Sequence, residues 1–243
     1  MLIDKKFIYL SLPRCGSTSM LVSCLKEKLE VEYCDYFVNK TQINTIQNID
    51  IDKIDENSLA RNLLHGHEPI NYLEEKFGYG FDIIAVKRNK YKRFISLWQH
   101  IIDLTINSGD TVSGEKMKQM DEFQILNFKV TADKEEIDYL VKNFIQDNEL
   151  SIDNIHLKLQ LRHLFMPLSS YHKFYEKIIW FDIENLTEME KWISNKLGKK
   201  FTLLNVNSSN KIECNLKLTE SFKQTYDKVF SDYDEPKIFK TFL

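Results

Sequence analysis

The sequence predicts a three-layer α/β/α fold with a mainly parallel central sheet. Three apolar runs, near 7–12, 81–86 and 177–182, have the length of buried strands, and each leads into a helical pattern. The first two runs end abruptly in basic or polar residues. Since ligands of open α/β sheets lie beyond the carboxyl ends of the strands, we expect these ends to face one crevice.

The first strand leads into a short turn that is typical of a phosphate site. Hydroxyl residues stand at the expected start of the next helix, where an N-cap belongs. Helix amides without an internal acceptor bind anions, a glycine lets the backbone approach closely, and a basic side chain and hydroxyls complete the cage. The turn is too short for the G-x-x-x-x-G-K-[ST] pattern. The residues concerned are Pro13-Arg14-Cys15-Gly16-Ser17-Thr18-Ser19.

The following stretch continues the alternation of helices and strands. A helix is expected at about 17–29, a strand at 31–38, and loop with short helix at 39–58. A short strand that ends in histidines is expected at 62–67, and a helix at 70–77.

A second strand end carries a cluster of positive charge. After the run 81–86 come Arg88 and, eight positions later, Ser96, with a helix continuing to about Ile106. Positive charge is unfavourable at a helix start, so a bound anion accounts for the cluster better than solvent does. An insertion is expected at about 107–154, with two amphipathic patterns around 115–128 and 134–147.

The third strand, 177–182, is followed by Ile183-Glu184-Asn185-Leu186 and by a capped helix that Gly198 closes. In order along the chain, the three segments resemble the PAPS-dependent sulfotransferases, where PAPS is 3′-phosphoadenosine 5′-phosphosulfate. The first resembles P-[KR]-x-G-[ST]-[ST], the second R-[ND]-P-x-x-R-x-x-S, and the third the strand-x-E-[ND]-L-helix segment of that family.

The resemblance implies a P-loop NTPase-like sulfotransferase fold that binds PAPS and its product PAP without a metal. It assigns the turn, residues 14–19, to the 5′-phosphosulfate, and Arg88 and Ser96 to the 3′-phosphate. Lys90 departs from the pattern, because the family usually has proline there to preorganise the backbone. Arg14 stands where many members have lysine; its expected role is electrostatic, since arginine does not give up its proton.

The resemblance also directs attention to the histidines before the second motif. An acceptor hydroxyl must lose its proton as it attacks sulfur, and a group that titrates near neutrality does this best. His67 matches the family's catalytic histidine most closely, Glu68 is the second candidate and His65 the third. A packed structural histidine is the competing interpretation.

Length, composition and charge limit the number of domains and the classes of partner. With 243 residues and 43% hydrophobic content, one domain spanning 1–243 is the default. A net charge of −3 gives no general attraction to nucleic acid or anionic membranes. The four cysteines show neither zinc spacing nor a disulfide framework. No signal peptide or membrane-length apolar run is evident, so we expect a cytoplasmic protein.

The sequence leaves the acceptor open between a carbohydrate and a small molecule, with the second motif closer to the carbohydrate branch. Two other functions remain. A nucleotide or small-molecule kinase with a degenerate loop would need a Mg²⁺-binding carboxylate at a strand end, and Asp182 is the candidate. A catalytically silent PAP-binding module would be expected to lack the base or Arg88.

Overall fold

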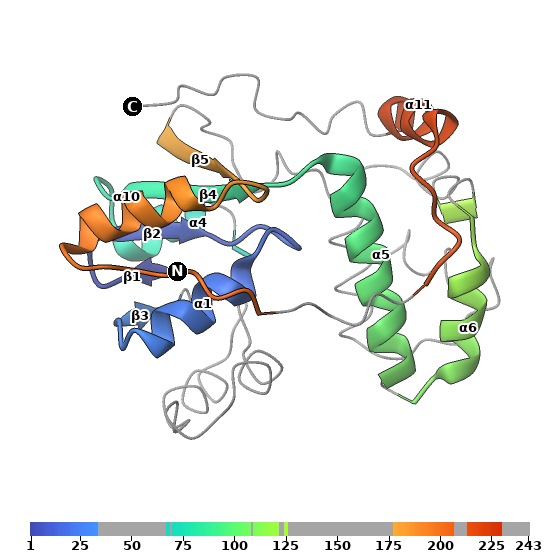
Figure 1. The fold of residues 1–243 in the computed structure, drawn as a ribbon, viewed down its shortest axis with the longest axis horizontal. Helices are drawn as coiled ribbons and strands as arrows, with labels where there is room; N and C mark the ends of the chain where they lie inside the picture. Colours follow the sequence, from blue (N-terminus) through green and yellow to red (C-terminus); the bar gives the residue numbers. More distant parts are fainter. Residues whose placement is uncertain are drawn as a thin grey trace. The chain divides into compact units, whose positions relative to one another are not determined.

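The computed structural model describes residues 1–33, 67–68, 70–107, 109–121, 124–125, 177–206 and 213–229 (Figure 1). The chain divides into two compact units. The first comprises 1–88, 168–208 and 236–243, and the second comprises 89–167 and 209–235. The expected strand at 62–67 apart from its last residue, the stretch 39–58 and most of the insertion at 107–154 lie outside the described residues.

The first unit contains a mixed five-stranded sheet of order β3-β1-β2-β4-β5. Its strands are β1 (Leu2–Ile3), β2 (Phe7–Leu10), β3 (Val31–Glu32), β4 (Asp82–Lys87) and β5 (Ile178–Asp182). Strands β2, β4 and β5 are parallel, as expected. The α/β class is therefore confirmed.

The antiparallel β1 departs from the mainly parallel sheet that the sequence predicted. It pairs with β2 and with β3, and the turn between β1 and β2 contains Asp4 and Lys5 with φ of 49° and 50°. Two successive residues with positive φ match the twist of a tight hairpin. Neither residue is glycine or asparagine, so the turn has no strong signal in the sequence.

Helices of the first unit cover both faces of the sheet. They are α1 (Ser17–Lys26), α4 (Ile70–Phe77) and α10 (Thr187–Leu197). Trp192 of α10 packs edge-to-face on Phe7 of β2, with ring centroids 5.3 Å apart. Figure 1 shows α4 on the other side of the sheet from α10. Every residue of β2 is buried, and so are Ile83 to Val86 of β4, because both strands are central and covered on two faces.

Helix α10 agrees with its expected span, and its C-terminal glycine is confirmed. Gly198 has a φ of 73°, and its N–H donates to Ser194 O at 2.9 Å. Its N-cap is Leu186, which makes no side-chain cap bond, so the start of this helix is not capped in the expected way. Helix α4 spans the predicted 70–77, whereas α1 ends three residues earlier than predicted, at Lys26.

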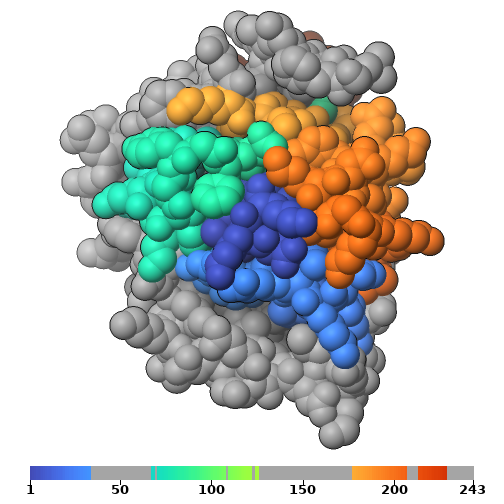
Figure 2. Space-filling view, turned by 90° about the vertical axis from the view of Figure 1, so that its left-hand side faces the viewer, coloured from blue at the N-terminus to red at the C-terminus, as the bar shows by residue number. Residues whose placement is uncertain are grey.

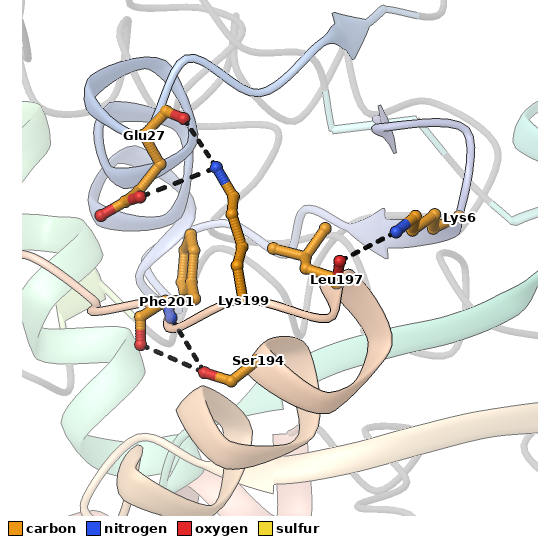
Figure 3. Close-up of polar contacts among 6 residues, drawn as sticks. All are labelled: Lys6, Glu27, Ser194, Leu197, Lys199 and Phe201. Carbon is orange, nitrogen blue, oxygen red and sulfur yellow. Dashed lines mark hydrogen bonds and ion pairs between the residues drawn. The ribbon is translucent and has the colours of Figure 1, made fainter.

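Residues 199–206 tie α10 to α1 (Figure 3). Lys199 Nζ donates to Glu27 O at the end of α1, and Lys6 Nζ donates to Leu197 O at the end of α10. Each lysine thus satisfies a terminal helix carbonyl and complements the negative end of a helix dipole. Ser194 Oγ accepts from Phe201 N at 2.9 Å.

Two further bonds hold the remainder of this segment along α1. Leu204 N donates to Ser23 Oγ at 2.8 Å, and Ser19 Oγ donates to Val206 O at 2.8 Å. Figure 2 shows the end of the unit opposite the carboxyl ends of the parallel strands, where the first ten residues lie between the segment of α4 and that of α10.

The second unit contains α5 (Lys90–Asn107), α6 (Thr111–Gln119) and α11 (Glu220–Val229). Helix α5 matches the expected helix after Arg88. Helix α6 begins four residues before the predicted 115, because Asp110 Oδ1 accepts from Ser113 N at 3.0 Å and caps it there. Gly114 is required in α6, since a Cβ at this position would collide with the side chain of Ile106. The second predicted pattern, 134–147, lies outside the described residues.

Candidate functional site

The turn between β2 and α1 has the backbone of an anion site. Its N-cap is Gly16, with a φ of 82°, and α1 receives no side-chain cap bond. The expectation that a hydroxyl residue caps α1 is therefore wrong. A Cβ built on Gly16 would meet no described heavy atom within 4 Å, so the glycine is needed for its positive φ and its outer side is open. Arg14 also has a positive φ, 62°, which is uncommon for a residue with a side chain.

The carbonyl oxygens of this turn all accept hydrogen bonds from the protein. Leu12 O accepts from Cys15 N at 3.2 Å, and Gly16 O accepts from Met20 N at 3.0 Å. Arg14 O accepts from Arg88 Nη1 at 3.3 Å, and Pro13 O from the Cys15 thiol at 3.6 Å.

Tyr9 completes this set, since its hydroxyl donates to Cys15 O at 3.4 Å. The acceptor side of the turn is thus engaged with the fold.

The donor side consists of the first amides of α1. The bond from Met20 to Gly16 is a helical i to i−4 bond, so the amides of Ser17, Thr18 and Ser19 precede it and have no acceptor within the helix. No acidic side chain lies in the first turn of α1 to compete for them. These amides and the positive end of the helix dipole favour a bound anion.

Two hydroxyls of this turn donate to backbone carbonyls of the protein. Ser17 Oγ donates to Leu12 O at 3.0 Å, and Ser19 Oγ donates to Val206 O. Each hydroxyl proton therefore goes to a backbone carbonyl and holds the turn or the 199–206 segment in place. Thr18 is buried. Cys15 is 1% exposed, and its amide and thiol both serve the turn.

His67 lies beside Ser11, which directly follows β2. Its Nδ1 is 2.8 Å from Ser11 O and 3.3 Å from Ser11 Oγ. A carbonyl oxygen can only accept, so Nδ1 carries the proton and Nε2 carries the lone pair in the neutral ring. This tautomer is the one that leaves Nε2 to act as a base.

Glu68 is much less accessible than a catalytic base needs to be. It is 3% exposed, and its Oε1 has no hydrogen-bond partner among the described residues. Burial raises the pKa of this carboxyl, an effect that the charged amino group of Met1 partly opposes. His65, the third candidate, lies outside the described residues.

Arg88 is brought to the turn before α1 by the register of the sheet. Leu10 of β2 pairs with Ala85 of β4, so the segments that leave these parallel strands run side by side. The hydrogen bond from Arg88 Nη1 to Arg14 O joins them. Two of the three sequence motifs are therefore in contact.

Two acidic residues account for part of the basic cluster. Lys87 forms an ion pair with Asp182 at 3.7 Å, and Lys90 forms one with Asp227 at 2.7 Å. Asp182 also accepts from Glu184 N at 2.9 Å. Carboxylates thus balance the charge of these two lysines, so the cluster favours a bound anion less strongly than the sequence suggested. Asp182, the carboxylate that the kinase alternative requires, thus already has a lysine and a backbone amide as partners.

The start of α5 is capped by Asn89, whose Oδ1 accepts from Tyr91 N and Lys92 N, both at 3.2 Å. Tyr91 OH donates to Asp227 Oδ2 at 2.8 Å, beside the ion pair of Lys90. Lys90, which stands where the family pattern has proline, thus forms an ion pair with α11. Ser96 is buried on α5, in the second unit.

The sequence did not predict the roles of Tyr9, which donates to Cys15 O, and of Ser11, which contacts His67 Nδ1. Tyr9 is one of the apolar and aromatic residues of a buried strand, and such a residue carries no sign of a further role. Ser11 gave a signal, since it is a polar residue within an apolar run at a strand end.

Comparison with family models, curated proteins and solved structures found no match to this chain. Within the described residues, no group of three or more His, Cys, Asp or Glu side chains is placed to hold a metal ion. None of the helices in the described part of the chain combines the length and apolar character needed to cross a bilayer.

Proposed function

We propose that this protein is a PAPS-dependent sulfotransferase of the P-loop-like sulfotransferase fold. The observation that carries the proposal is the turn before α1, whose carbonyls accept hydrogen bonds from the protein while the first amides of α1 have no acceptor within the helix. His67 beside β2 and Arg88 in contact with the turn add the two other groups that such an enzyme needs.

The residues present fit a 5′-phosphosulfate at the turn. The amides of Ser17, Thr18 and Ser19 would donate to its oxygens, and Arg14 would neutralise its charge. Bound PAPS supplies an activated sulfuryl group. The amides and Arg14 stabilise the negative charge that develops on the leaving phosphate oxygen, as in a loose in-line transfer. This role requires no proton transfer from Arg14.

His67 is the general base of this proposal. The bond from Nδ1 to Ser11 O fixes the ring, so Nε2 accepts the proton of the acceptor hydroxyl as that hydroxyl attacks. The burial of Glu68 favours His67 over Glu68 for this step. The acceptor is a carbohydrate or a small molecule with a free hydroxyl, and the reaction takes place in the cytoplasm.

The 3′-phosphate is assigned to Arg88 and Ser96 on the resemblance alone. Arg88 offers a fork of N–H donors that suits a phosphate dianion. A kinase that uses Mg²⁺ and ATP is the main alternative, and a silent PAP-binding module is the other.

Calorimetric titration tests the cofactor. We expect PAP to bind without added metal, and AMP, ATP and GTP to bind much more weakly. Replacing Arg88 with alanine should cost about 2–4 kcal/mol of PAP binding, because charge-assisted bonds to a phosphate are lost. Lys92→Ala removes one positive charge from an exposed position in the first turn of α5 and is the matched control. Equal affinity of the wild type for PAP and AMP would overturn the proposal.

A further inference from the structure

The contact between Arg88 and the phosphate turn has a consequence for how the site is organised. Arg88 Nη1 donates to the carbonyl oxygen of Arg14. Arg14 is not a glycine, yet its φ is 62°, in the left-handed region. An L-residue in this conformation is strained, so it persists only where neighbouring groups hold it. Arg88 is one of these groups.

The neighbouring carbonyl is held in a different way. Cys15 O accepts from the hydroxyl of Tyr9, a residue that is completely buried in β2. Tyr9 is buried beneath the turn, whereas Arg88 is partly exposed at the end of β4. Two donors from two strands thus fix adjacent peptide groups.

We propose that Arg88 is a positioning residue for the 5′-phosphosulfate turn in addition to its assigned contact with the 3′-phosphate. The inference rests on the proposed function for the identity of the ligand. One N–H of Arg88 donates to Arg14 O, and a guanidinium carries five N–H donors in a planar fork, so an arginine is able to hold a carbonyl and a phosphate at the same time. Recognition of the 3′-phosphate and the shape of the 5′ site are therefore coupled through Arg88.

The affinity for 5′-AMP distinguishes this role from simple binding of the 3′-phosphate. If Arg88 only contacts the 3′-phosphate, Arg88→Ala lowers the affinity for PAP and leaves that for 5′-AMP unchanged. If Arg88 also holds Arg14 O, the same variant lowers the affinity for 5′-AMP by about 3–10-fold, the value of one hydrogen bond. The affinity for PAP then falls further, since both contacts are lost.

Cys15 provides a measurement of the turn that needs no ligand. Its thiol is 1% exposed and points to Pro13 O within the turn, whereas Cys24 is fully buried in the middle of α1. We expect Arg88→Ala to raise the rate of Cys15 alkylation by iodoacetamide by about 3–10-fold relative to that of Cys24, because the turn opens more often. Peptide mass spectrometry resolves the individual cysteines.

The design uses three variants beside the wild type. Arg88→Lys keeps one charged donor for Arg14 O, so its 5′-AMP affinity and its rate of Cys15 alkylation should stay close to those of the wild type. It should lose much of the preference for PAP over 5′-AMP. Tyr9→Phe removes the bond to Cys15 O and should lower the affinities for PAP and 5′-AMP equally. Ser96→Ala should lower the affinity for PAP alone.

Two results separate this inference from the proposed function. Wild-type values of both 5′-AMP affinity and Cys15 alkylation in Arg88→Ala, with weakened PAP, would overturn the anchoring role and leave the sulfotransferase assignment standing. A wild type that does not prefer PAP over 5′-AMP would overturn the assignment, while faster Cys15 alkylation in Arg88→Ala and its reversal in Arg88→Lys would still support the anchor. Equal acceleration at Cys24 and Cys15 would show general unfolding and count against the anchor.

Discussion

Gly16→Ala offers a sharp test of the phosphate turn, because its effect on stability and its effect on binding have separate causes. Gly16 has a φ of 82°, and a Cβ there meets no described heavy atom within 4 Å. The substitution therefore causes no clash with the described part of the protein. Its cost is the left-handed conformation of an L-residue, about 1–2 kcal/mol of folding free energy.

Gly198 is a matched control in the same unit. It has a φ of 73°, a Cβ at this position also meets no described heavy atom within 4 Å, and it closes α10 rather than opening α1. Gly198→Ala should thus lower stability by a similar ~1–2 kcal/mol. It should leave ligand binding unchanged, because no part of the proposed site lies at the end of α10.

Binding should distinguish the two variants. At Gly16 the new methyl group stands at the helix N-terminus, where a phosphate has to approach the amides of Ser17 and Thr18. We expect PAP affinity to fall by at least about 10-fold, equivalent to ~1.4 kcal/mol. Urea denaturation followed by circular dichroism measures stability, and calorimetry measures PAP binding. If Gly16→Ala binds PAP as tightly as Gly198→Ala does, the turn is not the anion site.

Three other substitutions test the remaining parts of the site. His67→Ala should lower kcat by about 10²–10⁴ with little change in PAP affinity, and NMR of the wild-type imidazole should find the proton on Nδ1; a proton on Nε2 would contradict the assigned base. For Glu68→Gln, burial raises the carboxyl pKa, so the folded state binds the proton more tightly than the unfolded chain, and the stability from this group is lost as pH rises through the folded pKa. The variant should therefore unfold at a higher temperature than the wild type at pH 7–8 and at the same temperature near pH 4, whereas a lower Tm at pH 7 would mean that the carboxylate is paired. Lys90→Pro should cost under about 1 kcal/mol and preserve PAP affinity, since Lys90 is the first residue of α5 and its partner Asp227 is half exposed; a large loss of PAP affinity would give Lys90 a role at the ligand.

The elements that the sequence predicted well are those whose signals are local. The periodicity of 70–77 and the Gly198 stop gave helix bounds that the structure confirms. Apolar runs likewise located the three parallel strands. The antiparallel β1 was missed because it has two residues and is joined to β2 by Asp4, Lys5 and Lys6, a turn that contains no glycine or asparagine.

The proximity of Arg14 and Arg88 was predictable and the hydrogen bonds around them were not. The polar ends of β2 and β4 predicted that these two residues lie together, and Arg88 Nη1 donates to Arg14 O. The hydroxyl roles were not predictable. Ser19 donates to Val206, which is 187 positions away, and such a partner leaves no trace in the spacing around Ser19.

The contacts of the turn separate two kinds of information in its sequence. Tyr9, Ser17 and Arg88 use their side chains to bind carbonyl oxygens of the turn, so they determine which way its peptide groups face. In the proposed function the ligand is met mainly by backbone amides, which every residue except proline supplies. It follows that Ser17 matters for the carbonyl it binds rather than for a hydroxyl offered to phosphate. A turn with the same letters but without donors equivalent to Tyr9 and Arg88 would present its carbonyls less firmly inward and would bind an anion less well.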